Sequence, residues 1–384
     1  MSSAIDFTLP AVREAHEPPE ARGLGRDGVR LLVSRKDTGE IGHRAFRDLP
    51  AILAPGDLLV VNNSATMAAA VRLDRLAVHF SGELPTGEWL IELRRRTGGA
   101  TEPYMGGAPG EWLPLPGQAT LRLVSRETPR LWRAVLNRDV PSYLERYGVP
   151  IRYSYVARDW PLDHYQTVFG VEPGSAEMPS AGRPFTAALV TALVSRGVTV
   201  APITLHTGVA SPEKDEPPYP ERFSVPASTA RLVNLTRENG GRVIAVGTTV
   251  VRALESAALP RPDLARPDLI GPDLTRPDPP RPDPPRADLV GPARTGPDLV
   301  GPARTGLGRT GPVWAAEGWT SHIVTPSEGV RAVDGLLTGL HEPRSSHLMM
   351  LSAITEQDLL SRSYRAALDE GYLWHEFGDT HLIL

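Results

Sequence analysis

A chain of 384 residues with no cysteine can hold no disulfide, no zinc–thiolate site and no cysteine nucleophile, and its length favours two domains. Hydrophobic residues make up 41% and charged residues 22%, which is the balance of an ordinary globular protein. The formal net charge is -4, so a nucleic acid would have to meet a local basic patch rather than a cationic molecule.

The amino-terminal residues 1–23 have neither the basic start nor the apolar run of a signal peptide. No window approaches the ~20 apolar residues that a membrane helix needs. These features predict a cytoplasmic protein without a membrane partner. Arg94-Arg95-Arg96 is one local basic cluster, although such clusters are more often solvated strand ends than phosphate contacts.

Short β-strands are predicted in the amino-terminal part of the chain. Residues 30–49 alternate around a Lys-Asp-Thr-Gly turn, which predicts a β-hairpin. Residues 58–61 form an apolar strand that ends on Asn62 and Asn63. From residue 71 to residue 138, short strands are separated by glycine and proline, a pattern typical of a small antiparallel barrel or sandwich.

Helices alternate with apolar strands after residue 145. The patterns predict a tight turn at 178–186, helices at 187–197, 228–241 and 358–371, a strand at 198–206, and a strand, turn and helix at 242–258. Such alternation predicts an α/β fold with a mixed, mostly parallel sheet. We therefore expect residues 1–70 and 145–384 to form an α/β domain, and residues 71–144 to form an inserted antiparallel β-barrel domain.

Residues 261–312 differ from everything around them. They repeat about every five residues, with proline in the second place of nearly every unit. Each proline removes a backbone N–H donor, so the repeats are poorly suited to a stacked pentapeptide solenoid. The composition predicts an extended, disordered insertion that carries no chemistry.

Polar residues stand where predicted strands end or where a predicted helix begins. Ligands of open α/β sheets gather at such places, so one shared pocket is expected. The positions are Asn62, Asn63, His206, Gly208, Gly247, Thr248 and Thr249, with Ser180, Ala181 and Gly182 at the predicted turn. Each has a structural alternative: Gly-Thr-Thr is often a plain helix start, and Arg252 can pair with Glu255 on one helix face.

Several catalytic motifs are missing from the sequence. The ten histidines show no H-x-x-x-H or H-E-x-x-H spacing, so no metal site is predicted. The chain also lacks the G-x-S-x-G nucleophile elbow and the G-x-x-x-x-G-K phosphate loop, which disfavours hydrolase and nucleoside-triphosphatase functions.

Segments spread over the chain together resemble one family. They are GDLLVVNNS, YQTVFGVEPGSAEMPSAG, ITLHTGV, GGRVIAVGTTVVRALES, EGWTSHIVTP, VDGLLTGLHEPRSSHLMMLSA, SYRAALDEGY and FGDTHLIL. In order and spacing they are similar to the S-adenosylmethionine:tRNA ribosyltransferase-isomerases of queuosine synthesis. The resemblance runs from about residue 5 to the carboxyl terminus, broken only by the proline-rich insertion. It implies the architecture of this family, an α/β domain with an inserted β-barrel.

The resemblance also implies a reaction. S-adenosylmethionine would give its ribosyl group to the aminomethyl group of a deazaguanine base in tRNA, the ribose would rearrange to an epoxycyclopentane, and adenine and methionine would leave. The sulfonium acidifies the adjacent ribose C–H, so a positioned base could start the reaction. The implied proton-transfer residues are His206, His341, Glu221 and Asp334. The implied substrate-binding residues are Asn62, Asn63, Gln166, Ser180, Ala181, Gly182, Gly208, Gly247, Thr248, Thr249, Arg252 and Asp379.

The chain departs from the family pattern at motif positions. Arg183-Pro184 replaces a leucine–histidine pair, Ala65 and Ala70 replace two arginines, and Tyr219 replaces a histidine. Arg72 lies close by but would substitute only with a shift of register. These changes leave two alternatives to the family reaction: a diverged paralogue that uses the same donor pocket on another acceptor, or a non-catalytic protein that binds S-adenosylmethionine or RNA.

Overall fold

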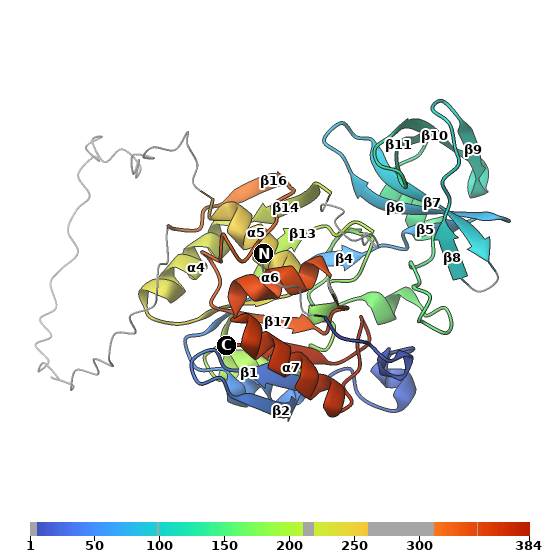
Figure 1. Cartoon of the computed structure of the whole chain (residues 1–384). Helices are drawn as coiled ribbons and strands as arrows, with labels where there is room; N and C mark the ends of the chain where they lie inside the picture. Colours follow the sequence, from blue (N-terminus) through green and yellow to red (C-terminus); the bar gives the residue numbers. More distant parts are fainter. Residues whose placement is uncertain (1–5, 98–99, 210–218, 260–310, 344) are drawn as a thin grey trace, which may run out of the picture. The chain divides into compact units, whose positions relative to one another are not determined.

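A large mixed sheet forms the main part of the computed structural model (Figure 1). The structure describes residues 6–97, 100–209, 219–259, 311–343 and 345–384. Four of the eight neighbouring strand pairs in these residues are parallel, so the sheet is evenly mixed rather than mostly parallel as predicted. Its strands lie in the order β16 (Ala316–Thr320), β14 (Glu221–Val225), β13 (Thr199–Leu205), β3 (Leu58–Asn62), β15 (Val243–Val246), β17 (Gly335–Gly339), β18 (Thr380–Ile383), β1 (Arg30–Ser34) and β2 (Ile41–Ala45).

Helices cover both faces of this sheet, because its central strands are apolar on both sides. Leu58 and Val60 of β3 pack in one core with α4, α5, α6 and α7, whereas Leu59 and Val61 pack in another with α1 and α3. The helices are α1 (Leu49–Ile52), α2 (Val140–Tyr147), α3 (Ala187–Ser195), α4 (Ala227–Glu238), α5 (Thr248–Ala257), α6 (Ser346–Ile354) and α7 (Gln357–Asp369). Short 3₁₀ turns are η1 (Ala11–Arg13), η2 (Pro19–Arg22), η3 (Phe46–Asp48), η4 (Pro116–Gln118), η5 (Leu162–Tyr165) and η6 (Ser180–Gly182).

A second, antiparallel sheet is built from residues 70–136 and curls into a half-barrel (Figure 1). Phe80, Ile91, Leu121 and Trp132 are among its fully buried core residues. Its strands are β5 (Ala70–Arg72), β6 (Leu76–Glu83), β7 (Trp89–Thr97), β11 (Leu131–Leu136), β10 (Ala119–Arg126) and β9 (Trp112–Leu115), with β8 (Ala100–Pro103) paired to β7. A short parallel pair, β4 (Ser64–Thr66) with β12 (Glu172–Ser175), follows β3.

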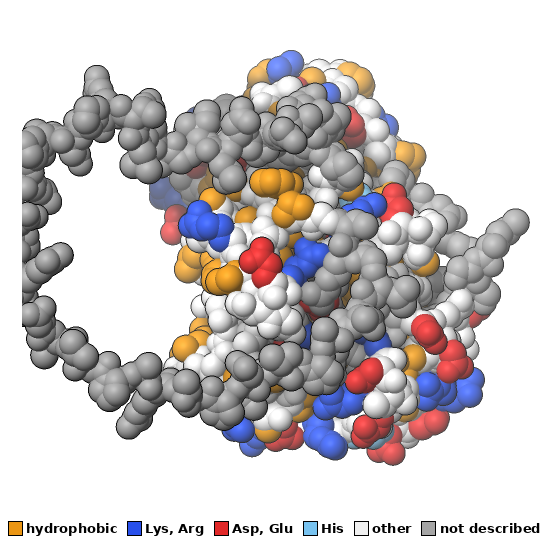
Figure 2. Space-filling model, turned by 90° about the vertical axis from the view of Figure 1, so that its left-hand side faces the viewer, with side chains coloured by type: hydrophobic (Ala, Val, Ile, Leu, Met, Phe, Trp, Pro, Cys, Tyr) orange, Lys and Arg blue, Asp and Glu red, His pale blue; other side chains and the backbone are white. Residues whose placement is uncertain are grey.

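Local predictions from the sequence can be compared with these elements. The hairpin predicted at residues 30–49 is confirmed by the antiparallel pair β1–β2, and the predicted helices match α3, α4, α5 and α7. The proline-rich insertion falls almost wholly in residues 260–310, outside the described part of the chain. Acidic and basic side chains are interspersed over the face in Figure 2, in keeping with the small net charge. None of the helices described is long and apolar enough to cross a membrane.

Candidate active site

Most of the predicted site residues lie along one edge of the main sheet. The strands β3, β13, β15 and β17 share one direction, so their carboxyl ends meet there. The strands β14 and β18 run the opposite way, so their amino ends reach the same edge. Asn62, His206, Gly247, Glu221 and Asp379 therefore lie along the same edge, although four strands separate β14 from β18 in the sheet.

Asp334 does not join this group. It precedes β17, and its Oδ2 accepts a hydrogen bond of 2.9 Å from the backbone N–H of Val243, the first residue of β15. Asp334 therefore lies at the opposite edge of the sheet, separated from His341 by the length of β17. Its predicted role in proton transfer has no support in this placement.

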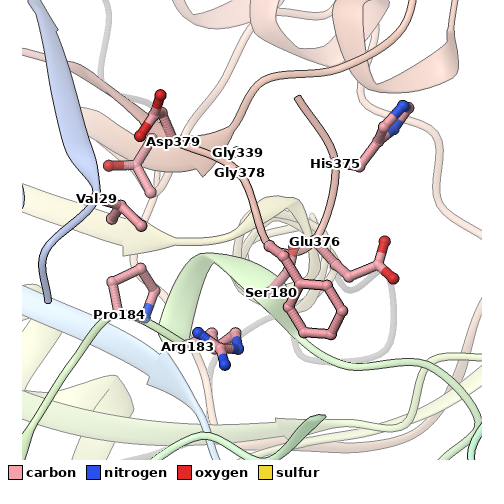
Figure 3. Close-up of a pocket in the computed structure, with 11 residues that line it drawn as sticks. Val29, Ser180, Arg183, Pro184, Gly339, His375, Glu376, Gly378 and Asp379 are labelled. Atoms are coloured by element: carbon pink, nitrogen blue, oxygen red, sulfur yellow. The ribbon is translucent and has the colours of Figure 1, made fainter. Parts of the chain in front are cut away.

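The turn Ser180-Ala181-Gly182 forms η6, which packs against β17 at the site edge. Gly247 adopts a positive φ of 96° as it starts α5, and a Cβ there would lie 3.5 Å from Cβ of Ala181. The turn and the Gly-Thr-Thr start of α5 therefore adjoin, as a shared pocket requires. Ser180 also lines a small pocket with Gly339 and Asp379 (Figure 3).

Asp379 in this pocket is committed to the backbone. Its two carboxylate oxygens accept hydrogen bonds from the N–H groups of Arg30 at 2.7 Å and Leu373 at 2.9 Å. Burial raises its pKa, against the effect of these bonds. Asp379 therefore fixes the entry into β18.

Arg183, the departure at the tip of the turn, is also committed to structure. Its side chain is 2% exposed, and its guanidinium donates to Glu20 Oε2 at 2.9 Å and to the carbonyl of His164 at 2.8 Å. The same group lies 5.0 Å from the ring centroid of Phe377. The arginine therefore ties the turn to the amino-terminal segment, although it borders the pocket in Figure 3.

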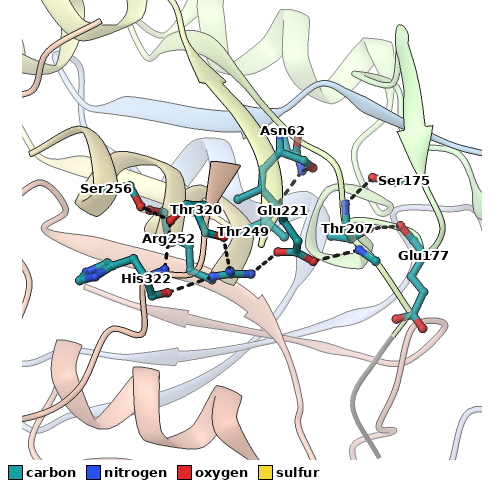
Figure 4. A network of polar contacts seen from close by, with 12 residues as sticks. Asn62, Ser175, Glu177, Thr207, Glu221, Thr249, Arg252, Ser256, Thr320 and His322 are labelled. Carbon is teal, nitrogen blue, oxygen red and sulfur yellow. Dashed lines mark hydrogen bonds and ion pairs between the residues drawn. The ribbon is translucent and has the colours of Figure 1, made fainter. Parts of the chain in front are cut away.

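Glu221 lies at the centre of a polar network at the site edge (Figure 4). Its Oε1 accepts a hydrogen bond of 2.9 Å from the N–H of Gly208, and its Oε2 pairs with Arg252. Arg252 also donates to the carbonyls of Thr320 and His322, each at 3.3 Å. The Glu221 and Arg252 side chains are only 15% and 11% exposed. Arg252 therefore holds Glu221 in one orientation.

The alternative in which Arg252 pairs with Glu255 is wrong. The Glu255 carboxylate instead accepts hydrogen bonds of 2.8 Å from the N–H groups of Arg331 and Ala332. Arg252 pairs instead with Glu221, which stands 31 positions earlier in the sequence.

Two predicted amide side chains order the strand ends. Asn62 binds both backbone groups of Leu205, with its Nδ2 2.8 Å from the carbonyl oxygen and its Oδ1 3.0 Å from the nitrogen. Its Nδ2 also lies 3.4 Å from Oγ1 of Thr249 at the start of α5. Asn63 Oδ1 accepts a bond of 2.7 Å from the Thr204 hydroxyl. These asparagines therefore link β3 to β13, and Asn62 alone reaches α5.

Gln166 binds β4, the strand that follows β3. Ala65 and Ala70, where the resemblance implies arginine, lie in β4 and β5. The Gln166 amide is bound at both ends to the backbone of Thr66, at 3.0 and 2.8 Å. Ala65 and Ala70 are buried, and Arg72 does not replace the missing cations, because its guanidinium makes two bonds of 2.7 Å to Asp159. The structure therefore brings no arginine from this segment to the network of Figure 4.

His206 is linked to two serines. Its Nδ1 lies 2.8 Å from Oγ of Ser64, which lies 2.6 Å from Oγ of Ser175. A side chain at Gly174 would collide with the imidazole, so glycine is required there. Burial lowers the pKa of His206 to about 4, with a smaller contribution from Arg222. The imidazole is therefore neutral at physiological pH.

His341 is neutral for the same reason. Its Nε2 lies 2.8 Å from the Thr338 hydroxyl, and its ring stacks on His347 at 4.5 Å between centroids. Burial, and then the neighbouring His347, hold the pKa of His341 well below its usual value. Both imidazoles are therefore in the neutral form at pH 7, with one ring nitrogen protonated. A third position where the resemblance implies a histidine is Tyr219. Its hydroxyl lies 3.4 Å from Oγ1 of Thr128.

Glu376 is a titratable residue that the sequence analysis missed. It borders the pocket of Figure 3, and the Tyr155 hydroxyl donates to its Oε2. Its Oε1 is buried and has no hydrogen-bond partner in the described residues. Burial raises the pKa of Glu376 to about 7, against the effect of the Tyr155 bond.

This shift predicts a pH-dependent stability. The pKa of Glu376 in the folded protein lies above its ordinary value of 4.5. The contribution of Glu376 to the free energy of unfolding is therefore fully present below about pH 4.5 and is lost as the pH rises to about 7. Glu376→Gln should therefore exceed wild type by about 3 kcal/mol in free energy of unfolding at pH 8, and most of the difference should vanish at pH 5. Urea denaturation at both pH values measures this; a constant offset between the two proteins would contradict it.

No set of three or more histidine, aspartate or glutamate side chains in the described chain is placed to hold a metal ion. The site is thus built from a carboxylate–guanidinium pair, neutral imidazoles, hydroxyl groups and a helix start.

Comparison with known proteins identifies the family of the chain. A family model described as a queuosine biosynthesis protein matches residues 2–383. The chain belongs to this family. A relative from Symbiobacterium thermophilum, named S-adenosylmethionine:tRNA ribosyltransferase-isomerase, is 32% identical over 394 residues, covering 100% of this chain and 99% of the relative. A relative of the same name from Thermus thermophilus is 31% identical over 404 residues, with 99% of both chains covered.

A solved structure of this queuosine family shares the fold. The crystal structure of S-adenosylmethionine tRNA ribosyltransferase from Thermotoga maritima matches with a TM-score of 0.50 and 26% identity, and the match covers 99% of both chains. The resemblance noted in the motifs is therefore confirmed over the whole length of the chain.

Proposed function

We propose that this chain is an S-adenosylmethionine:tRNA ribosyltransferase-isomerase of queuosine biosynthesis. It transfers the ribosyl group of S-adenosylmethionine to a deazaguanine base of tRNA and rearranges it. The observation that carries the proposal is the full-length similarity to relatives of that name. Because the acceptor is tRNA, we place the reaction in the cytoplasm. We also retain residues 71–144 as an inserted domain within an α/β domain formed by residues 1–70 and 145–384.

Glu221 is the group that we assign to the first proton transfer. The donor's sulfonium acidifies the adjacent ribose C–H, and a carboxylate can take that proton. The pKa of His206 is about 4 and that of His341 is well below its usual value, so neither imidazole is a stronger base than a carboxylate. Asp334 lies at the other edge of the sheet. Among the predicted acid–base residues, Glu221 is the carboxylate at the site edge, and Arg252 orients it.

The remaining groups at this edge are suited to binding the donor. Thr248 and Thr249 open α5, whose first N–H groups have no partner within the helix and point toward the site edge. His206 and His341 offer neutral hydrogen-bonding nitrogens without adding charge next to a cationic sulfonium. Ser180 and Gly182 bring the backbone of η6 beside the same helix start. The site thus combines a carboxylate–guanidinium pair with uncharged polar groups, so it adds no net positive charge beside a positively charged nucleoside.

A diverged activity on another acceptor is the second candidate. It is favoured by Ala65 and Ala70, which place no arginine beside the network where the family carries two. The non-catalytic alternative, a protein that binds S-adenosylmethionine or RNA, keeps the same pocket.

One assay separates these functions. Purified protein is incubated with S-adenosylmethionine, with and without tRNA that bears the precursor base, and adenine and methionine are measured by mass spectrometry. We expect release of both products only when the tRNA is present. Release without tRNA would support the second candidate, and donor binding without release would support a non-catalytic role.

A further inference from the structure

We propose that a second pocket, lined by Arg72, Arg152, Asp159, Trp160 and Tyr165, binds a nucleotide of the acceptor RNA that flanks the reacting base. Its base would lie against Trp160, and its phosphate would lie beside the two arginines. The pocket has a volume of about 340 Å³, within the range of small-molecule sites. This inference rests on the proposed function, because it takes tRNA as the acceptor.

The charges around the pocket favour an anion. Arg72 makes two bonds of 2.7 Å to Asp159, and Nε of Arg152 lies 3.4 Å from the same carboxylate. Hydrogen bonding by Arg72 lowers the pKa of Asp159, so the carboxylate is ionised. Two guanidinium groups therefore share one negative charge, and one positive charge remains for a phosphate. Arg158 adds a third guanidinium on the rim.

The aromatic wall of the pocket favours a nucleobase. The guanidinium of Arg158 lies 4.1 Å from the ring centroid of Trp160, so the indole already supports a planar cationic group on one face. Single-stranded nucleic acids are commonly bound by such aromatic rings together with basic side chains. The combination distinguishes this pocket from a simple phosphate site.

Two buried polar atoms of the lining side chains also call for a ligand. The indole Nε1 of Trp160 and the hydroxyl of Tyr165 have no hydrogen-bond partner in the part of the chain that the structure describes. Tyr165 is only 4% exposed, so its hydroxyl is withdrawn from bulk water. Buried polar groups rarely stay unpaired in native proteins.

The pocket is connected to the candidate active site. The carbonyl of Tyr165 accepts a hydrogen bond of 2.7 Å from the Thr66 hydroxyl in β4, the strand that also carries Ser64, the partner of His206. On its other side the Tyr165 ring packs on Phe377 at 5.2 Å between centroids, and Phe377 lines the pocket of Figure 3. A nucleotide bound here would therefore neighbour the site of chemistry.

The test measures binding of a fluorescently labelled anticodon stem-loop RNA by anisotropy. Trp160→Ala should weaken RNA binding about 10-fold, as expected for the loss of one stacked base, and Trp160→Phe should keep most of the affinity. Arg72→Ala with Arg152→Ala should weaken binding and reduce the slope of log affinity against log salt by about 0.7, the value for one lost single-strand phosphate contact. The matched control is Trp112→Ala, because Trp112 is 60% exposed and also lies under an arginine, Arg122, but outside the pocket.

Three results would overturn the inference. Trp160→Ala and the double arginine variant could bind RNA as wild type does, with unchanged melting temperatures. Trp160→Ala could instead weaken S-adenosylmethionine binding alone, which would make the pocket part of the donor site. Wild type could bind no RNA and release no adenine, which would overturn the proposed function as well. RNA binding is measured apart from turnover, so failure of the pocket alone is distinguishable from failure of the function.

Discussion

Glu221→Gln should lower the rate of adenine release at least 100-fold at saturating S-adenosylmethionine. Glutamine keeps the shape of the side chain and can still accept the hydrogen bond from Gly208, but it cannot take a proton from the donor. Loss of a general base typically costs a factor of about 100 to 10,000. Single-turnover kinetics with precursor tRNA measure the chemical step, and calorimetric titration measures donor binding.

Controls separate a role in chemistry from a role in folding. Glu317 lies on β16, next to the strand that carries Glu221, and it is exposed, so Glu317→Gln should leave the rate unchanged. Arg252 positions Glu221, so Arg252→Ala should reduce the rate and Arg252→Lys should restore part of it. Wild-type rates in Glu221→Gln, with the melting temperature preserved, would remove Glu221 from the mechanism.

Grouping of the site residues at one sheet edge could be predicted from sequence. Asn62 and His206 each follow an apolar strand, and parallel strands place their carboxyl ends together. Asp334 shows the limit of this reasoning. It stands only seven positions before His341 in one family segment, but β17 lies between them and carries the two residues to opposite edges.

The mixed strand directions and the pKa of Glu376 could not be predicted in this way. Hydrophobic periodicity does not state whether a connection returns a strand parallel or antiparallel, and β14 and β18 are both antiparallel to a neighbour that precedes them in the chain. The environment of Glu376 depends on Tyr155, which lies 221 positions earlier in the chain. Only the folded structure brings the two side chains into contact.

Glu20→Ala should lower the free energy of unfolding by about 3 kcal/mol, because it leaves a buried guanidinium without its carboxylate. Burial lowers the pKa of Arg183, and the hydrogen bond and charge of Glu20 oppose this effect. Without Glu20, the 2% exposed arginine keeps its bond to the carbonyl of His164 but loses its counter-ion. Urea denaturation measures the loss. Glu17→Ala, in the same segment, is the matched control and should change stability by less than about 0.5 kcal/mol.

Arg183→Leu should cost less than Glu20→Ala, because leucine removes the buried charge and Glu20 keeps Arg26 as a partner at 3.2 Å. Once Arg183 is leucine, removing Glu20 should add little, so the double variant should recover most of the loss seen in Glu20→Ala. Losses that simply add would show that the two side chains are not coupled. Leucine is also the residue that the resemblance to the family implies at this position. An unchanged rate of adenine release in Arg183→Leu would therefore mean that Arg183 takes no part in the chemistry of the site. Its role would then be to hold the amino-terminal segment against the turn, at a position where a packing residue was replaced.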